Sequence, residues 1–450
     1  MSKRAARVAA LWLALSLAWP GAAFAASGFT LRKVALAGES APGTSDTFAT
    51  PTAVAMDPAG EVAFLSSLSS GPDATGGWVE VGGVLSLRMR SGDPAPGAGG
   101  TYSMLAGFPQ LDASGGLALL ALISGGTSPR GVFLDAGSGD SALLLSGAAA
   151  PPAVGGTLTA GLADLQPFGF RDGVLLFRSG VTGGSASSGL FRRSPVGSLT
   201  VIALTGQAAP GAGGATYSGF THPSLDLFAR PAFTASLVGG SSARGLFADT
   251  GAGLSARALA GNAAPGTGGG SFTDFLYPAG AGGAVAFLAV VSGGSASVTG
   301  GVFLDDSGIA PVAVEHQLAP GTGGGTLFQL NTPPTIDGYR NVSFSANVTG
   351  GSVSGGVFRY DTDAAALAPV ALAGESVPGV SSPLSSFGHV AAGGGGAVAF
   401  AAKLADGRDG VFVATPVAVI PALPAAWGLV VAIGVAALAR AQLRRAHRVN

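Results

Sequence analysis

Between residues 26 and 414 the chain is a succession of short apolar runs separated by glycine, proline, serine and aspartate. One stretch shows the pattern, with apolar runs at 257–260, 271–276, 284–291 and 301–304. Short runs rich in β-branched and aromatic residues between such breakers are typical of strands. No sustained 3.6-residue apolar period with caps occurs in this interior, so a helical repeat is not expected. The pattern predicts four strands in each stretch of this length.

The same stretch recurs seven times. A signal made of glycine, two residues, a small residue and phenylalanine recurs every 54 to 58 residues, a spacing that random glycine-rich sequence would not hold. It ends at Phe64, Leu119, Phe177, Phe233, Phe287, Phe344 and Phe400. Seven repeats of about 56 residues with four strands each predict an all-β fold, a seven-bladed β-propeller. A β-solenoid is the alternative, although its repeats are usually shorter and need end caps.

Two further signals keep the same period. The first, Gly-x-x-Ala-Pro-Gly, places its proline at Pro42, Pro96, Pro151, Pro210, Pro265, Pro320 and Pro378, and departs from the pattern at Pro152, His316 and Val377. The second, Gly-Val/Leu-Phe, ends at Phe133, Phe191, Phe247, Phe303, Phe358 and Phe412, and we place its first copy at Gly83-Val84-Leu85. Strands such as 284–291 are apolar throughout, which predicts blades covered on both faces. We expect strands 34–36 and 410–412 to meet in one blade and close the ring, because open sheet edges invite aggregation.

The N-terminal 25 residues have the three zones of a secretory signal peptide. Lys3, Arg4 and Arg7 precede an apolar helix-forming stretch at 8–18. The small residues Ala23 and Ala25 then precede Ala26 and mark the cleavage site. The segment predicts export, with signal peptidase as a processing partner.

The C-terminal residues predict a second targeting signal. Residues 415–419 form a linker, and 420–450 contain an apolar helical stretch followed by Arg440, Arg444 and Arg445, which hold that end on the cytoplasmic side of a membrane. The order resembles the IPTL-CTERM variant of the PEP-CTERM sorting signals. The resemblance rests on Ile420, Pro421, Ala422, Leu423, Trp427 and Gly428 before the arginines. Ala422 replaces the usual threonine, and Pro424-Ala425-Ala426 replaces the usual Ser-Glu pair. The resemblance implies removal by an exosortase-type membrane protease; a plain C-terminal membrane anchor is the alternative.

The repeat itself carries a family resemblance. Asp57-x-x-Gly60-x-x-Ala63-Phe64 resembles the NxxGxxAF motif of exported bacterial choice-of-anchor tandem-repeat proteins, over residues 34–412. The copies depart from the motif at Phe170, Gly280 and Gly393 in its first position, and at Ala229 and Arg340 in its glycine position. The resemblance implies a cell-surface or extracellular location in a bacterium, of Gram-negative type, and it transfers no catalytic residue.

Composition narrows the chemistry. The chain has 23 Lys+Arg, 24 Asp+Glu and no cysteine, which excludes disulfide scaffolds, iron–sulfur proteins and cysteine nucleophiles, and gives no footprint for nucleic acid. The histidines lie in different repeats or in the tail, with no pair at metal-ligand spacing: His222, His316, His389 and His447. We expect no cofactor or metal; calcium is the alternative at the aspartate pairs Asp305/Asp306, Asp361/Asp363 and Asp406/Asp409.

One repeated polar position stands out in a chain poor in polar side chains. It follows the first residue of the proline signal and is polar in six copies of seven: Glu39, Asp93, Gln207, Asn262, Gln317 and Glu375. In a ring these positions would lie at one level and form a polar rim for a cation or for sugar hydroxyls. The alternative is that each side chain hydrogen-bonds its own turn.

Two functions remain open. The first is a non-enzymatic surface or matrix protein that presents a rigid scaffold for binding, with an exopolysaccharide or envelope component as partner. The second is a propeller-type carbohydrate-active enzyme, a glycosidase or lyase. Glycosidases usually need two carboxylates at a defined separation, and no repeat is singled out by an acid–base group. The sequence therefore favours the first function.

Overall fold

We describe a computed structural model of the chain. It describes residues 28–417 except 160–167, 296–297 and 331. The predicted signal helix, the cleavage site at Ala23, Ala25 and Ala26, and the sorting signal at 420–450 lie outside the described residues. The described residues up to Pro416 form one compact unit, which contains every strand that the structure describes. Among the described residues no helix has the length and apolar character needed to cross a bilayer.

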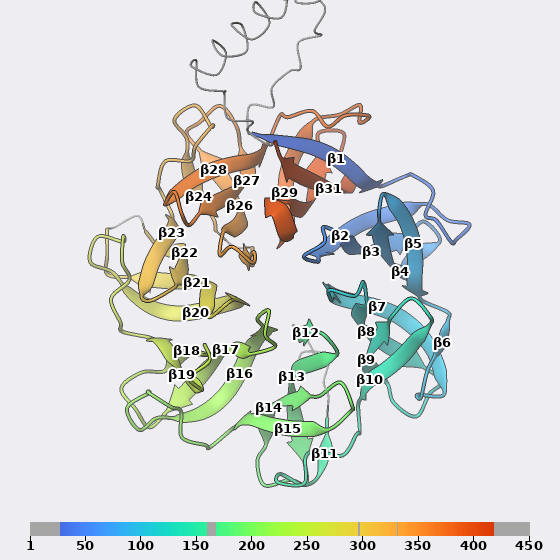
Figure 1. Cartoon of the computed structure of the whole chain (residues 1–450), viewed down its shortest axis with the longest axis vertical. Coiled ribbons are helices and arrows are strands. Elements are labelled where there is room, and N and C mark those ends of the chain that lie inside the picture. Colours follow the sequence, from blue (N-terminus) through green and yellow to red (C-terminus); the bar gives the residue numbers. More distant parts are fainter. Residues whose placement is uncertain (1–27, 160–167, 296–297, 331, 418–450) are drawn as a thin grey trace, which may run out of the picture. The chain divides into compact units, whose positions relative to one another are not determined.

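Strands of this unit form seven antiparallel sheets arranged as the blades of a propeller (Figure 1). The prediction of a seven-bladed all-β propeller is therefore confirmed. Blade 1 contains β2 (Phe48–Met56), β3 (Val62–Leu68), β4 (Gly71–Val81) and β5 (Val84–Arg90). Blade 2 contains β6 (Pro94–Ala95), β7 (Gly100–Leu111), β8 (Leu117–Ser124), β9 (Arg130–Asp135) and β10 (Asp140–Leu145). Blade 3 contains β11 (Thr157–Leu158), β12 (Gly169–Arg171), β13 (Val174–Thr182), β14 (Ser188–Arg193) and β15 (Leu199–Leu204).

The remaining blades follow the same order, from the innermost strand outward. Blade 4 contains β16 (Thr216–Leu225), β17 (Pro231–Val238), β18 (Arg244–Asp249) and β19 (Leu254–Leu259). Blade 5 contains β20 (Ser271–Ala281), β21 (Ala284–Ser292), β22 (Gly300–Asp305) and β23 (Ile309–Val314). Blade 6 contains β24 (Thr326–Phe328), β25 (Thr335–Ile336), β26 (Val342–Thr349), β27 (Gly355–Asp361) and β28 (Ala366–Leu372). Blade 7 contains β29 (Leu384–Ala392), β30 (Val398–Leu404), β31 (Asp409–Pro416) and β1 (Phe29–Leu36), with the short 3₁₀ turn η1 (Gly394–Gly396) between its first two strands.

The first strand of the chain closes the ring, as the sequence predicts. β1 pairs antiparallel with β31, from Phe29 opposite Pro416 to Leu36 opposite Gly410. The N-terminal strand thus becomes the outermost strand of the last blade (Figure 1). Arg32 on β1 also donates two hydrogen bonds of 2.7 Å to the carboxylate of Glu80 in blade 1. Closure therefore combines a full strand ladder with a bidentate ion pair to the next blade.

The hydrophobic core lies between the blades. In the described ranges, each of seven clusters of buried residues joins two neighbouring blades. β21 shows why its sequence does not alternate: seven of its nine residues are buried, because blades 4 and 6 cover its two faces. The apolar strands of the sequence are therefore explained by burial on both sides, as expected.

Each blade repeats one cross-strand pair of large side chains between its second and third strands. In blade 5 this pair is Phe287 and Phe303, whose rings stack 5.8 Å apart. The glycine two residues before the second ring leaves space for it: a Cβ on Gly301 would lie 3.0 Å from the Phe303 ring. The Gly-Val/Leu-Phe signal thus reflects packing, because the absence of a Cβ on its glycine leaves space for the ring of the phenylalanine two residues later.

One register prediction is wrong. Gly83-Val84-Leu85, which we expected to be the first copy of that signal, lies at the start of β5, the outermost strand of blade 1. The residue opposite Phe64 is Trp78, and the two rings stack 5.8 Å apart. A Cβ on Gly76 would clash with the Trp78 ring. Gly76-Gly77-Trp78 is therefore the first copy, and the tryptophan hid it from a search for phenylalanine.

The Asp-x-x-Gly part of the motif forms the turn between the first and second strands of a blade. Oδ1 of Asp226 accepts hydrogen bonds from the backbone N–H groups of Phe228 (2.8 Å) and Arg230 (2.9 Å). Gly60, at the glycine position, has φ +89°. Ala229 and Arg340 take the same position with φ +55° and +68°, so these departures keep the turn at the cost of backbone strain.

Candidate functional site

A channel runs along the middle of the ring, lined by the innermost strand of every blade. Its central part has a volume of about 220 Å³. It is lined by residues 54–56, 109–111, 170–171, 224–225, 279–280, 333–336 and 389–392. Two further cavities share residues with it and extend it in both directions: we call them the mouth pocket, of about 310 Å³, and the aromatic pocket, of about 130 Å³. The channel is the concave site that the fold offers to a ligand.

Bulges in the innermost strands shape the aromatic pocket. The pairing register shifts between Thr221 and Ser224 in β16 and between Leu276 and Ala279 in β20. Within these bulges His222 and Tyr277 have φ +49° and +48°. A bulge re-aims the side chains at that point of a strand. Both residues line the aromatic pocket, together with Phe108, Phe168 and His389.

The rings of this pocket meet in pairs. Phe108 and His389 stack with centroids 4.6 Å apart, and His222 packs edge-on against Tyr277 at 4.3 Å. Burial lowers the pKa of His389 to about 4, although a hydrogen bond with the Val54 backbone raises this pKa in part. Burial likewise lowers the pKa of His222 to about 4. Both imidazoles are neutral at pH 7, so this end of the channel is uncharged and aromatic.

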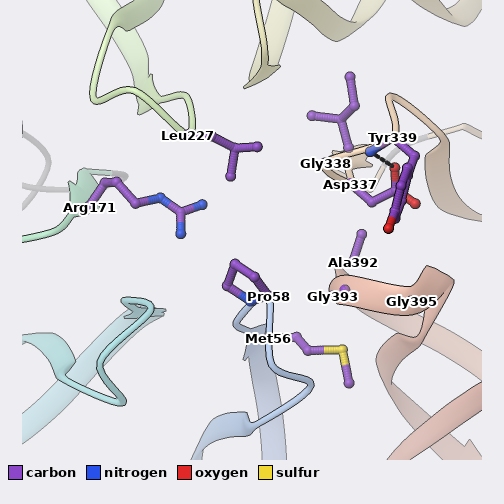
Figure 2. Close-up of a pocket in the computed structure, with 12 residues that line it drawn as sticks. Met56, Pro58, Arg171, Leu227, Asp337, Gly338, Tyr339, Ala392, Gly393 and Gly395 are labelled. Carbon is purple, nitrogen blue, oxygen red and sulfur yellow. Dashed lines mark hydrogen bonds between the residues drawn. The ribbon is translucent and has the colours of Figure 1, made fainter.

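The mouth pocket, unlike the aromatic pocket, contains a charged side chain that points into it (Figure 2). Met56, Pro58, Leu227, Tyr339 and the glycines at 393–395 line it, and the guanidinium of Arg171 points into it between Leu227 and Pro58. Gly393 and Gly394 approach blade 1 closely, since a Cβ on either would clash with Met56 or with the carbonyl oxygen of Pro58. This crowding explains why blade 7 lacks the motif aspartate at position 393.

Asp337 in the lining of the mouth pocket and Asp112 in blade 2 are held by their own turns. Asp337 accepts hydrogen bonds from the N–H groups of Tyr339 (2.8 Å) and Asn341 (2.9 Å) and from the amide of Asn341, and Arg359 lies 3.5 Å away. Asp112 accepts hydrogen bonds from the N–H groups of Ser114 and Gly116 in the same way. These aspartates stabilise hairpins and are poorly placed to abstract or donate a proton. Asp57 accepts the Glu61 N–H with Oδ1, and its buried Oδ2 has no hydrogen-bond partner among the described residues.

The six residues of the predicted polar rim follow the outermost strands of their blades. Four side chains accept a hydrogen bond from a backbone N–H three residues earlier, the arrangement that the turn alternative describes. The acceptors are Gln207, Asn262, Gln317 and Glu375, at 3.0, 2.7, 3.2 and 3.1 Å. Glu39 forms an ion pair with Lys33, and Asp93 forms one with Arg90 at 3.2 Å. None of the six lines the three channel cavities, and ligand binding by them stays a prediction.

Two of the three aspartate pairs considered for calcium have ion-pair partners, and in the third Asp361 accepts a hydrogen bond from the Ala364 N–H. Asp305 and Asp306 form ion pairs with Arg257 and Arg340. Asp406 and Asp409 form ion pairs with Arg408 and Lys403. Within the described ranges, no three His, Cys, Asp or Glu side chains gather as a metal site would require.

Sequence reasoning missed the residues that line the channel. It noted His222 and His389 as belonging to different repeats, and the fold brings both to the aromatic pocket. A signal was present four residues before the first position of the motif, where copies 1, 2, 4, 6 and 7 have Ala53, Phe108, His222, Pro333 and His389 and copy 5 has Leu276, next to Tyr277. Arg171 lay in a repeat whose motif departs from the family at Phe170, which concealed its place in the ring.

Comparison with known proteins places the chain in a family. Its sequence matches the model of a family of unknown function (DUF7453) over residues 17–168, 171–295 and 280–396. The chain belongs to that family. Three successive matches along one chain agree with a tandem repeat. No curated protein matches the sequence.

Solved structures are similar to the chain at low identity. A puromycin-hydrolyzing peptidase of Mycobacterium tuberculosis is 13% identical with a TM-score of 0.41, over 83% of this chain and 52% of that one. A gluconolactonase of Xanthomonas campestris is 12% identical (TM-score 0.33; 88% and 92% covered), and the Aleuria aurantia lectin is 11% identical (0.32; 71% and 96%). The chain spans about half the length of the peptidase. Likenesses at this distance carry no statement about activity.

Proposed function

We propose that this protein is an exported, non-enzymatic binding propeller whose ligand enters the central channel. The observation that carries the proposal is the state of the channel's polar groups. The two imidazoles are neutral and packed against rings, and Asp337 in the mouth pocket is held by the turn that it caps. Asp112 and Asp226 cap the equivalent turns of their own blades and line none of the three cavities. The described lining offers a ligand ring faces, proline walls, the guanidinium of Arg171, and three neutral polar side chains, Gln110, Ser224 and Thr335. Such a surface recognises a ligand without acid–base chemistry.

The proposal also includes the location of the protein. The signal sequence, the tandem repeat and the tail that resembles IPTL-CTERM signals support export, sorting by an exosortase-type protease, and a final place at the cell surface or in the extracellular matrix. A closed ring with cores between all its blades suits a scaffold that must persist outside the cell without disulfides.

Location is tested by fractionation and mass spectrometry of the protein in its own cells, with and without residues 420–450. We expect a mature chain that lacks residues 1–25, in the envelope or the medium. The shortened chain should lose its attachment while keeping the same N-terminus. A cytoplasmic protein with Met1 intact would contradict the proposed address.

The absence of turnover is tested separately. The mature protein is incubated with a panel of neutral and acidic polysaccharides, and both retention on the polysaccharide and release of new reducing ends are measured. We expect retention without release. Release that disappears in a channel variant such as Arg171→Gln would establish the enzyme alternative instead.

A further inference from the structure

We infer that the mouth pocket binds a carboxylate carried on a six-membered ring, with Arg171 holding the carboxylate and Tyr339 contacting the ring. This inference rests on the proposed function and names the class of ligand for it.

Arg171 places a positive charge in the mouth pocket. It ends β12, and its guanidinium extends into the pocket (Figure 2). Within the part of the chain that the structure describes, Arg171 has no hydrogen bond and no ion pair. Most other arginines of this propeller have one, as Arg32, Arg257 and Arg359 show. A guanidinium presents paired N–H donors whose spacing matches the two oxygens of a carboxylate.

Charge around the pocket favours a single negative group. Asp337 also lines it, but its two oxygens are engaged by Asn341, the Tyr339 N–H and Arg359. The adjacent Asp172 is exposed in the β12–β13 turn and forms no ion pair with Arg171. Arg171 is thus the one cation in the described lining of the mouth pocket, and a carboxylate matches its charge.

The side chains that line the mouth pocket favour a ligand with a flat apolar face. Tyr339 lies across the pocket from Arg171 and is 70% exposed, an unusual exposure for a large aromatic side chain (Figure 2). Leu227 and Pro58 lie on either side of the guanidinium. The pocket volume of about 310 Å³ is at the small end of the range for small-molecule sites, roughly 300–1,000 Å³. One ring with its carboxylate is the size of ligand that such a pocket admits.

Calorimetric titration of the mature protein at low salt tests the inference. The probes are glucuronate, a sugar ring with a carboxylate; benzoate, an aromatic ring with a carboxylate; glucose, the same sugar ring without the charge; and acetate, the charge without a ring. We expect glucuronate or benzoate to bind, and the tighter of the two identifies the ring. Glucose and acetate should each bind at least about tenfold more weakly, because each lacks one of the two contacts.

Variants then assign the contacts. Arg171→Gln should weaken the better ring carboxylate at least about tenfold. Arg192→Gln is the matched control, since it removes one positive charge from β14 of the same blade, away from the channel, and should bind like the parent. Tyr339→Ala should reduce ring carboxylates to the affinity of acetate while leaving acetate unchanged.

Three results would each overturn the inference: glucose binding as tightly as glucuronate, Arg171→Gln binding like the parent, or no binding by either ring carboxylate. These failures differ from failure of the proposed function, which would appear as cytoplasmic location or as turnover of a polysaccharide. A ligand retained by Arg171→Gln would leave the proposed function standing and refute the carboxylate site.

Discussion

Acid should weaken this propeller through a group at its centre. His389 lies in the aromatic pocket, stacked on Phe108, with Nδ1 buried and without a hydrogen-bond partner among the described residues. Burial lowers its pKa from 6.5 to about 4. Between these two pH values the unfolded chain binds a proton at this site that the folded protein does not bind. Stability is therefore complete above about pH 7 and falls as the pH is lowered toward 4.

The size of the effect follows from the shift. At about 1.4 kcal/mol per pKa unit, the full shift corresponds to about 3.4 kcal/mol. His389 as a whole is only partly buried, so we expect a loss of about 2–3 kcal/mol from this residue. His389→Phe removes the titration and keeps the stacked ring. It also loses the hydrogen bond to the Val54 backbone, which should cost about 1 kcal/mol at pH 8.

Denaturant unfolding of parent and variant between pH 8 and pH 4 measures this difference. The parent should lose about 2–3 kcal/mol more than His389→Phe over that range, so that the variant is the more stable protein at pH 4. His316→Asn is the matched control: His316 is exposed, and this variant should follow the pH dependence of the parent. Parallel curves for the parent and His389→Phe would refute the assignment of acid sensitivity to the buried imidazole.

Other predictions test the repeat, its turn and its closure. Phe287→Ala should cost roughly 3–5 kcal/mol, because the Phe287 ring is fully buried against Phe303 and its neighbours; a melting curve that overlays the parent would contradict the core assignment. Gly60→Ala should lower the free energy of unfolding by about 1–2 kcal/mol through backbone strain alone, since no atom lies within 4 Å of the added Cβ. Ala229→Gly should raise the free energy of unfolding by a smaller amount, because glycine relieves the same strain. Denaturant midpoints that shift in the same direction for the two variants would refute this reasoning. Deleting residues 29–36 exposes the edge of β31, and we expect association on size-exclusion chromatography with a broadened unfolding transition; a monomer with the parent's melting temperature would show that β1 is dispensable.

The architecture could be predicted from the sequence because each repeated signal acts on neighbouring residues. Phe287 and its equivalents anchor a strand, and Gly60 and its equivalents permit a turn, each by a property of one residue and its near neighbours. The copy at Gly76-Gly77-Trp78 was missed because the packing requirement is for a large ring two residues after a glycine, and tryptophan satisfies it as well as phenylalanine. The turn role of Asn262 and its equivalents was also foreseeable, since the hydrogen bond spans three residues.

The period of the strands, the number of blades and the meeting of first and last strands were thus determined by the sequence alone. Tertiary structure decided which side chains share the channel. Phe108 and His389 are 281 positions apart in the sequence and stack only because ring closure places blade 7 next to blade 1 and blade 2 beyond it. Arg171 carries no local mark of its position, because exposure at the centre of a ring depends on all seven blades. Local chemistry can specify a repeat, but the chemistry of the channel depends on residues brought together by closure.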